Sequence, residues 1–203
     1  MHPRDLGRTV LLCMIGGSAD AIAFLRYGTF VGAMTGNTVL LGIDLAKANL
    51  DRAGFHLGIV AIFLAAVIVT DVALKLRIPP RVPLLLTALM LGGSEFIAGQ
   101  WSAAICAAAL GAQNAAVRTI AGVPLNTVFI TGNLARLGAA VPQAAVPQQR
   151  ATVVVLAVAW LAYAAGAVAG AAALHLIDYA MIVPAVLAVA AAAGTSAECC
   201  GQD

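Results

Sequence analysis

Several long stretches of the chain carry no charge, and they constrain its fold more than any other feature. Between Ala53 and Thr70 only His56 can take up a proton near neutral pH, and the stretches 151–177 and 179–197 add only His175. A helix needs about 20 apolar residues to cross the hydrocarbon core of a bilayer. Charged residues make up 10% of the chain, against roughly 25% in a soluble domain. The sequence therefore predicts an all-α integral membrane protein, a polytopic bundle of helices surrounded by the lipid bilayer.

A short motif occurs twice in the same surroundings. Thr-Gly-Asn, three further residues and Leu-Gly occupy 35–42 and 131–138, and each copy follows a Gly-x-x-(Asp/Asn)-Ala element at 17–21 or 111–115. Two copies with the same flanks and order indicate an internal duplication. We therefore expect one membrane domain made of two repeats and ending in a polar tail. The repeats run from 8 to 100 and from 102 to 197, and the tail from 198 to 203.

Each half contains four apolar segments, and the second of each four is unusual. The segments lie at about 8–26, 28–46, 53–74 and 82–100, and then at 102–118, 119–137, 151–175 and 179–197. The second segment carries the Gly and Asn of the motif in its middle. Backbone inside a bilayer has to satisfy its own hydrogen bonds, so a break here has to be buried in protein or line a wet cavity.

Two topologies fit these segments. If the broken segments dip into the membrane and return, the chain has six full spans and inverted halves. If they cross it, the chain has eight full spans and parallel halves. With a cytoplasmic N-terminus, the six-span arrangement places eight basic residues inside and three outside, and the eight-span arrangement places six and five. The eight are Arg4, Arg8, Lys75, Arg77, Arg81, Arg118, Arg136 and Arg150.

Cytoplasmic loops carry an excess of Lys and Arg, so the charge distribution favours six spans plus two broken segments. The spacing of Gly28, Gly32 and Gly36 favours the eight-span alternative, because small residues four apart suit a continuous, closely packed helix. Gly166 and Gly170 form a similar pair, which indicates helix packing or homodimerisation.

The two motifs are candidates for a substrate site. Their residues are Thr35, Gly36, Asn37, Thr131, Gly132 and Asn133. In inverted halves the two breaks meet near the middle of the membrane, and a half-helix after each break aims its N–H groups at the centre. Inverted-repeat transporters place their sites in this way. Gln113 and Asn114 precede the second motif and join the candidate set. The alternative is that both motifs only pack and cap helices.

Two acidic residues lie inside apolar segments. Asp20 falls about two-thirds of the way along the first, and Glu95 lies within the fourth. A buried acid in a membrane usually faces a cavity or a partner. Asp20 and Glu95 are therefore candidates for proton or ion coupling. The alternative is a structural pair with Arg26 or Arg118. Asn114 is the neutral counterpart of Asp20, so any coupling would differ between the halves.

Other sequence features argue against several classes of function. A net charge of +2 gives no reason to expect nucleic acid as a partner. The four cysteines lack the spacing of a disulfide framework or a metal site, and Cys199 and Cys200 lie in the tail. We expect no metal, no cofactor and no catalytic residues, since no hydrolase, zinc-protease or nucleotide-binding motif occurs. His56 and His175 lie at span ends, where an interfacial position is expected.

The doubled pattern carries a family resemblance. Gly-Ser-Ala-Asp20-Ala, Phe30-Val-x-x-Met34-Thr-Gly-Asn and Gly-Ala-Gln-Asn114-Ala resemble the YoaK-like bacterial membrane proteins, grouped as domain of unknown function 1275. The resemblance extends over nearly the whole chain and implies a small multi-pass protein of the bacterial inner membrane. It supplies no function. One local difference between the copies is Arg136, which stands where the first copy has Leu40.

Three functions remain after this reading of the sequence. The leading hypothesis is a transporter or channel for a small solute, with its site between the two motifs and Asp20 and Glu95 in proton coupling or substrate contact. The second is a membrane scaffold or accessory subunit, in which the motifs only pack helices. The third, an intramembrane enzyme, would need a water-accessible pair of acids.

Overall fold

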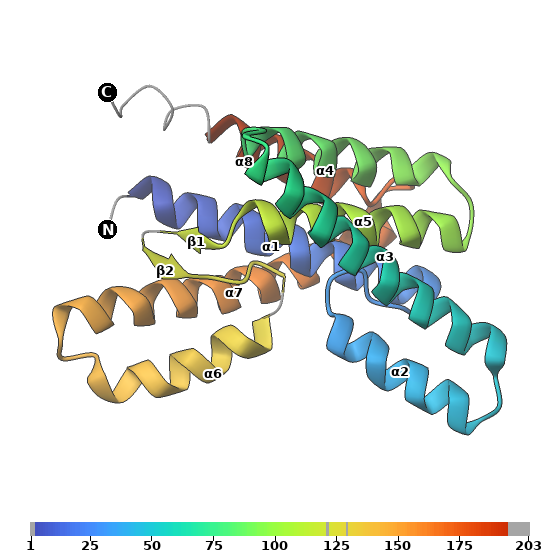
Figure 1. Cartoon of the computed structure of the whole chain (residues 1–203), viewed down its shortest axis with the longest axis horizontal. Coiled ribbons are helices and arrows are strands. Elements are labelled where there is room, and N and C mark those ends of the chain that lie inside the picture. Colours follow the sequence, from blue (N-terminus) through green and yellow to red (C-terminus); the bar gives the residue numbers. More distant parts are fainter. Residues whose placement is uncertain (1–2, 121, 129, 195–203) are drawn as a thin grey trace.

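The computed structural model of the chain describes residues 3–120, 122–128 and 130–194, and it is a bundle of helices (Figure 1). Three helices in the described part are both long and apolar enough to cross a membrane. They are α1 (Pro3–Tyr27), α3 (Leu50–Lys75) and α7 (Pro147–Leu176). At about 1.5 Å per residue, each exceeds the roughly 30 Å of a hydrocarbon core.

The other elements are shorter. The helices are α2 (Met34–Ala46), α4 (Arg81–Gly93), α5 (Gln100–Ala116), α6 (Ile130–Ala140) and α8 (Ile182–Gly194). The 3-10 turns η1 (Ser94–Phe96) and η2 (Val141–Gln143) follow α4 and α6, and a two-stranded antiparallel hairpin joins β1 (Thr119–Ile120) to β2 (Val123–Pro124).

The expected all-α membrane bundle is therefore confirmed, whereas six full spans are not. The segment expected at 82–100 holds α4, whose 13 residues extend about 20 Å, and then only the short turn η1. Pro79 and Pro80 precede this helix, and Gly92 and Gly93 end it. The segment expected at 119–137 includes the hairpin, which the sequence reading missed.

Both Thr-Gly-Asn segments are broken, and the motif lies in the first turn of a helix rather than mid-helix. Helix α2 starts at Met34 and α6 starts at Ile130. Residues 28–33 and 125–128 are non-helical, and Gly28 has a φ of +67°, which suits glycine. The continuous helix that the glycine spacing favoured is not formed.

Contacts between helices fix their relative directions. Leu12 of α1 lies near Gln113 of α5, and Tyr27 lies near Ser102, so α1 and α5 run antiparallel. Helices α1 and α7 run parallel instead, because Gly166 faces Met14 and Gly170 faces Ser18. The first helices of the two halves therefore point in opposite directions.

Glycines allow the closest of these approaches. A Cβ on Gly17 of α1 would lie 2.0 Å from the Tyr163 carbonyl oxygen of α7, and one on Gly111 of α5 would lie 2.6 Å from that of Phe63 in α3. A Cβ on Gly166 would likewise lie 2.4 Å from the Met14 carbonyl oxygen. Gly166 and Gly170 thus pack α7 on α1 within one chain, which is the helix packing that was one of the two expectations for this pair.

The outer surface of the bundle is apolar. Leu57, Leu64 and Val69 of α3 are 56%, 56% and 67% exposed. Side chains of this kind have no favourable contact with water, but they match lipid tails. Helix α1, in contrast, is largely buried, so the candidate residues that it carries face protein.

Candidate functional site

Each Thr-Gly-Asn motif attaches the start of its helix to the loop before it through the Asn side chain. Asn37 accepts a hydrogen bond from the Phe30 backbone N–H (2.9 Å) and donates one to the Phe30 carbonyl (2.6 Å). Asn133 makes the same two contacts with Asn126, at 3.2 and 2.5 Å. In both cases the partner lies seven residues earlier. Both Asn side chains are buried and engaged by backbone.

The other motif residues are more accessible. Thr35 and Thr131 are exposed, Gly36 is half-buried and Gly132 is exposed. In Figure 1, α2 and α6 start near the middle of the molecule and run outward in different directions. Two short helices thus begin at the broken segments, and the Thr side chains at their starts are exposed.

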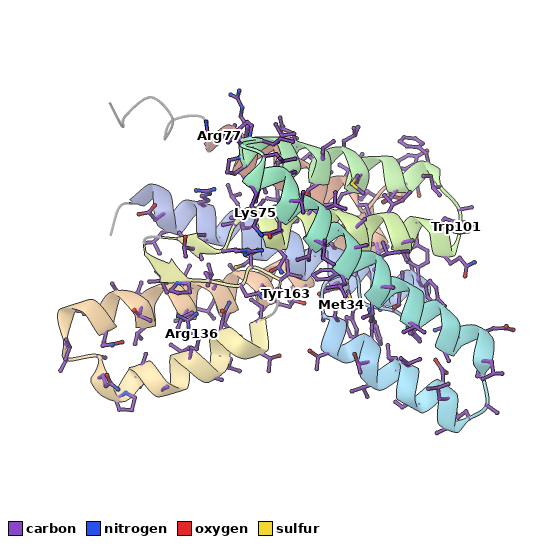
Figure 2. All side chains as sticks on the ribbon, in the orientation of Figure 1. Met34, Lys75, Arg77, Trp101, Arg136 and Tyr163 are labelled. Atoms are coloured by element: carbon purple, nitrogen blue, oxygen red, sulfur yellow. The ribbon has the colours of Figure 1, made fainter. Side chains whose placement is uncertain are left out.

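Asp20 is buried and binds the loop before α2. Its Oδ1 accepts hydrogen bonds from the backbone N–H groups of Val31 (2.8 Å), Gly32 (2.6 Å) and Ala33 (3.3 Å). Its Oδ2 accepts a 2.5 Å bond from the Tyr163 hydroxyl. Figure 2 shows Tyr163 near the middle of the view, close to Met34 at the start of α2. Asp20 thus joins α1, α7 and the first broken segment, and neither Arg26 nor Arg118 pairs with it.

Two aromatic rings stack beside this loop. Phe24 of α1 stacks on Phe30 of the loop, with ring centroids 4.6 Å apart. Phe30 also lies against Gly36, where a Cβ would come within 2.8 Å of the ring. The glycine of the first motif is therefore needed to seat an aromatic ring.

The second broken segment faces a cavity instead. About 450 Å³ of space lies between the end of α5, the hairpin and α6. The polar residues that line it are Asn114, Arg118, Asn126, Asn133 and Arg136. Of the predicted substrate residues it therefore brings together Asn114, Gly132 and Asn133.

Gln113 lies next to Asn114 but points into the protein. Its side-chain N–H₂ donates to the Leu12 carbonyl (2.9 Å) and the Thr127 hydroxyl (3.3 Å). Its Oε1 is buried and has no hydrogen-bond partner among the described residues. This acceptor is available to a water or solute that reaches the interior between α1 and α5.

Glu95 has a cationic partner, Arg26, at the C-terminal end of α1. Its Oε2 lies 2.8 Å from Arg26, whose other nitrogen donates to the Asp178 carbonyl (3.0 Å). Its Oε1 accepts a hydrogen bond from the Met181 backbone N–H. The structural pairing considered for the acids is therefore realised by Glu95 with Arg26.

Arg118 pairs with an acid that the sequence reading did not single out. Its guanidinium lies 2.8 Å from Asp71 of α3, and Lys75 lies 2.8 Å from the same carboxylate. One carboxylate thus faces two cations at the ends of α3 and α5. Arg118 is a charge partner, as expected, but of Asp71 rather than of Asp20 or Glu95.

His56, expected at a span end, is buried in protein contacts. The side chain is buried on α3, where Nε2 lies 3.2 Å from Asp44 of α2 and Nδ1 lies 3.1 Å from the Thr29 hydroxyl. Thr29 also donates to Asn37 (3.0 Å). Asp44 on α2 is the sequence feature that could have predicted this contact, because a carboxylate in an apolar helix needs a partner from a neighbouring helix.

The sequence reading also missed Tyr163. A tyrosine in a long apolar helix is unremarkable alone, and only the packing of Gly17 against its backbone places its hydroxyl at Asp20. Within the described residues no group of three or more His, Cys, Asp or Glu is placed to hold a metal ion. The Cys199 and Cys200 pair lies outside the described residues.

Comparison with known proteins agrees with this picture of a membrane bundle. The family model described as "Protein of unknown function (DUF1275)" matches residues 9–194. The chain is 27% identical over 187 residues to the UPF0700 transmembrane protein RA0705 of Rhizobium meliloti (strain 1021), covering 91% of this chain and 83% of that protein. No solved structure matches it.

Proposed function

The chain belongs to the DUF1275 family of unknown function, and we propose that it moves a small solute across the bacterial inner membrane. The path runs between the two Thr-Gly-Asn segments. One observation carries this proposal: of the two broken segments, the first has stacked aromatic rings beside it and the second opens onto a cavity. A carrier exposes its site to one side of the membrane at a time, and two unlike segments beside one site are compatible with such alternation.

The proposed topology has inverted repeats, 8–100 and 102–197, with six crossings and two half-helices. The antiparallel course of α1 and α5 supports it, and so do the matching contacts of Asn37 and Asn133. In Figure 1 the N-terminus and the turn between α6 and α7 lie on the left, and the turn between α2 and α3 lies on the right. By the distribution of basic residues, the left side is cytoplasmic.

Proton coupling is proposed at Asp20. Its four hydrogen-bond donors are three backbone N–H groups and one hydroxyl, so no cation neutralises it in these contacts. Release of the loop before α2 would uncover the carboxylate, and this links its protonation to the closed state of the first segment. Glu95 has Arg26 as its counter-ion and serves the coupling less directly, by holding α1 to η1.

The experiment is a flux assay with purified protein in vesicles that contain a pH-sensitive dye. A panel of small organic acids, amines, amino acids and sugars is added outside, and internal pH is followed. We expect at least one solute to change internal pH in vesicles with protein and not in empty ones, and Asp20→Asn to abolish the change. A proton-coupled flux that persists in folded Asp20→Asn would remove Asp20 from the mechanism.

A scaffold or accessory subunit is the second candidate, and one observation favours it. Both motif Asn side chains are used by the backbone of their own segment, as packing elements would be. On this reading, replacing Asn37 or Asn133 lowers the amount of folded protein and changes no flux. Neither candidate assigns a catalytic reaction to the chain.

A further inference from the structure

Polar residues line the cavity at the second broken segment where the first segment has aromatic ones. Phe24 comes four residues after Asp20, and Phe30 comes five residues before Thr35. The residues at the same steps in the second segment are Arg118 and Asn126. Both line the cavity, so an aromatic stack in one segment corresponds to polar walls in the other.

The glycines of the motifs show the same difference. A Cβ on Gly36 would lie 2.8 Å from the Phe30 ring, whereas no described residue lies within 4 Å of a Cβ built on Gly132. Gly132 lines the cavity. No described side chain beside the second motif takes the place of the ring beside the first.

The charges are exchanged as well. The first segment has an acid, Asp20, where the second has neutral Asn114. It has apolar Leu40 five residues after Thr35, where the second has Arg136 at the same step. With Arg118 in place of Phe24, the second segment thus has one negative charge fewer and two positive charges more at the matching positions.

The lining of the cavity is cationic. The described residues that line it include two arginines and no acid. Asp71 neutralises only part of the nearby charge, because Lys75 and Arg118 share its carboxylate. Arg136 is fixed by a hydrogen bond to the Pro124 carbonyl. A guanidinium has five N–H donors, so this contact leaves others for a ligand.

We infer that this cavity binds a small anion with a carboxylate, sulfate or phosphate group, with Arg136 as its main charge contact and Arg118, Asn114 and Asn126 around it. A volume of about 450 Å³ suits a metabolite-sized ligand. The inference rests on the proposed transport function, for which it names the solute class. The cavity is then the cytoplasmic end of the path, since the end of α5 and the basic turn after α3 lie together there.

The test measures binding and flux separately. Purified full-length protein is titrated with the sodium salts of acetate, lactate, succinate, sulfate and phosphate at constant ionic strength, and its thermal unfolding is followed by tryptophan fluorescence. Arg136→Leu introduces the residue of the first segment, and Arg136→Lys keeps the charge. Arg150→Leu is the matched control, because Arg150 is exposed on α7 and does not line the cavity. All variants are first checked for a single folded species by gel filtration.

We expect at least one of these anions to raise the unfolding temperature in a saturable way, with equal affinity in wild type and Arg150→Leu. The affinity should fall about tenfold or more in Arg136→Leu, since a charge-assisted contact to the anion is lost, and less in Arg136→Lys. Absence of saturable binding by all five anions, or binding unchanged in Arg136→Leu, overturns the inference.

Two further readouts separate this inference from the proposed function and from lipid binding. Binding without flux of the same anion in vesicles leaves the anion site standing and removes transport. Flux of an anion that is unaffected in Arg136→Leu leaves transport standing and removes this site. Occupation by phosphatidylglycerol added to the micelles, with no binding of a soluble anion, overturns the assignment to a solute.

Discussion

The hydroxyl of Tyr163 on α7 donates a 2.5 Å hydrogen bond to the carboxylate of Asp20 on α1. The corresponding contact of the other half has no such bond. There Gly111 packs on Phe63, which has no hydroxyl, and Asn114 stands in the position of Asp20. The two halves thus share their packing and differ in their polar chemistry, and the differences fall at the proposed site.

Tyr163→Phe should lower the free energy of unfolding by about 1 kcal/mol, because one buried hydrogen bond is lost while the packing of the ring is retained. Tyr179→Phe is the control, since this ring is 51% exposed. Thermal unfolding in detergent is the measurement. Equal unfolding temperatures for Tyr163→Phe and wild type would contradict the contact.

Asn37→Ala should destabilise the protein more than Asn133→Ala. Asn37 binds both backbone groups of Phe30 and also accepts from Thr29, whereas Asn133 makes the corresponding pair of contacts with Asn126. The loss should be about 2–3 kcal/mol for Asn37→Ala, as buried polar groups are left without partners. Unfolding by denaturant or heat ranks the two variants, and the reverse order would contradict this reading.

Gly17→Ala should disrupt the packing of α1 on α7. The new methyl group would lie 2.0 Å from the Tyr163 carbonyl oxygen, and backbone there cannot move independently of α7. Overpacking of this kind costs about 1–3 kcal/mol. Gly7→Ala on the same helix is the control, because nothing lies within 4 Å of its Cβ. That control should be neutral or slightly stabilised, since Ala favours a helix over Gly.

The Asp44 and His56 pair should behave as one unit. Asp44→Ala leaves the buried His56 without its carboxylate and His56→Ala leaves the half-buried Asp44 without its partner, so the effects of the two changes on unfolding should not add in the double variant. A coupling energy of about 1 kcal/mol or more is expected for a contacting buried pair. Additive effects would show that the two side chains do not interact.

The sequence predicts the class of fold and the two places where it is broken. Long uncharged runs are enough to recognise α3 and α7, and the repeated Thr-Gly-Asn marks the starts of α2 and α6. It does not predict where the helices end. Helix α4 stops at Gly92 and Gly93, which hydropathy alone treats as part of a longer apolar segment.

The candidate site was only partly predictable for a different reason. Asp20 could be recognised because an acid inside an apolar run is costly. Its partners could not, since Tyr163 is 143 residues away and is brought to it by glycine packing between α1 and α7. Likewise Arg118 and Arg136 are ordinary basic residues until the fold places both beside one cavity.

The inverted arrangement of the two halves is the central claim, and cysteine labelling tests it most directly. In a cysteine-free background, cysteines at Ala48 and Ile78 are treated with a membrane-impermeant reagent from each side. Ala48 is exposed between α2 and α3, and Ile78 lies in the basic turn before α4. We predict that position 78 reacts only from the cytoplasm and position 48 only from outside. The reverse pattern would contradict inverted halves and, with them, a path between the two broken segments.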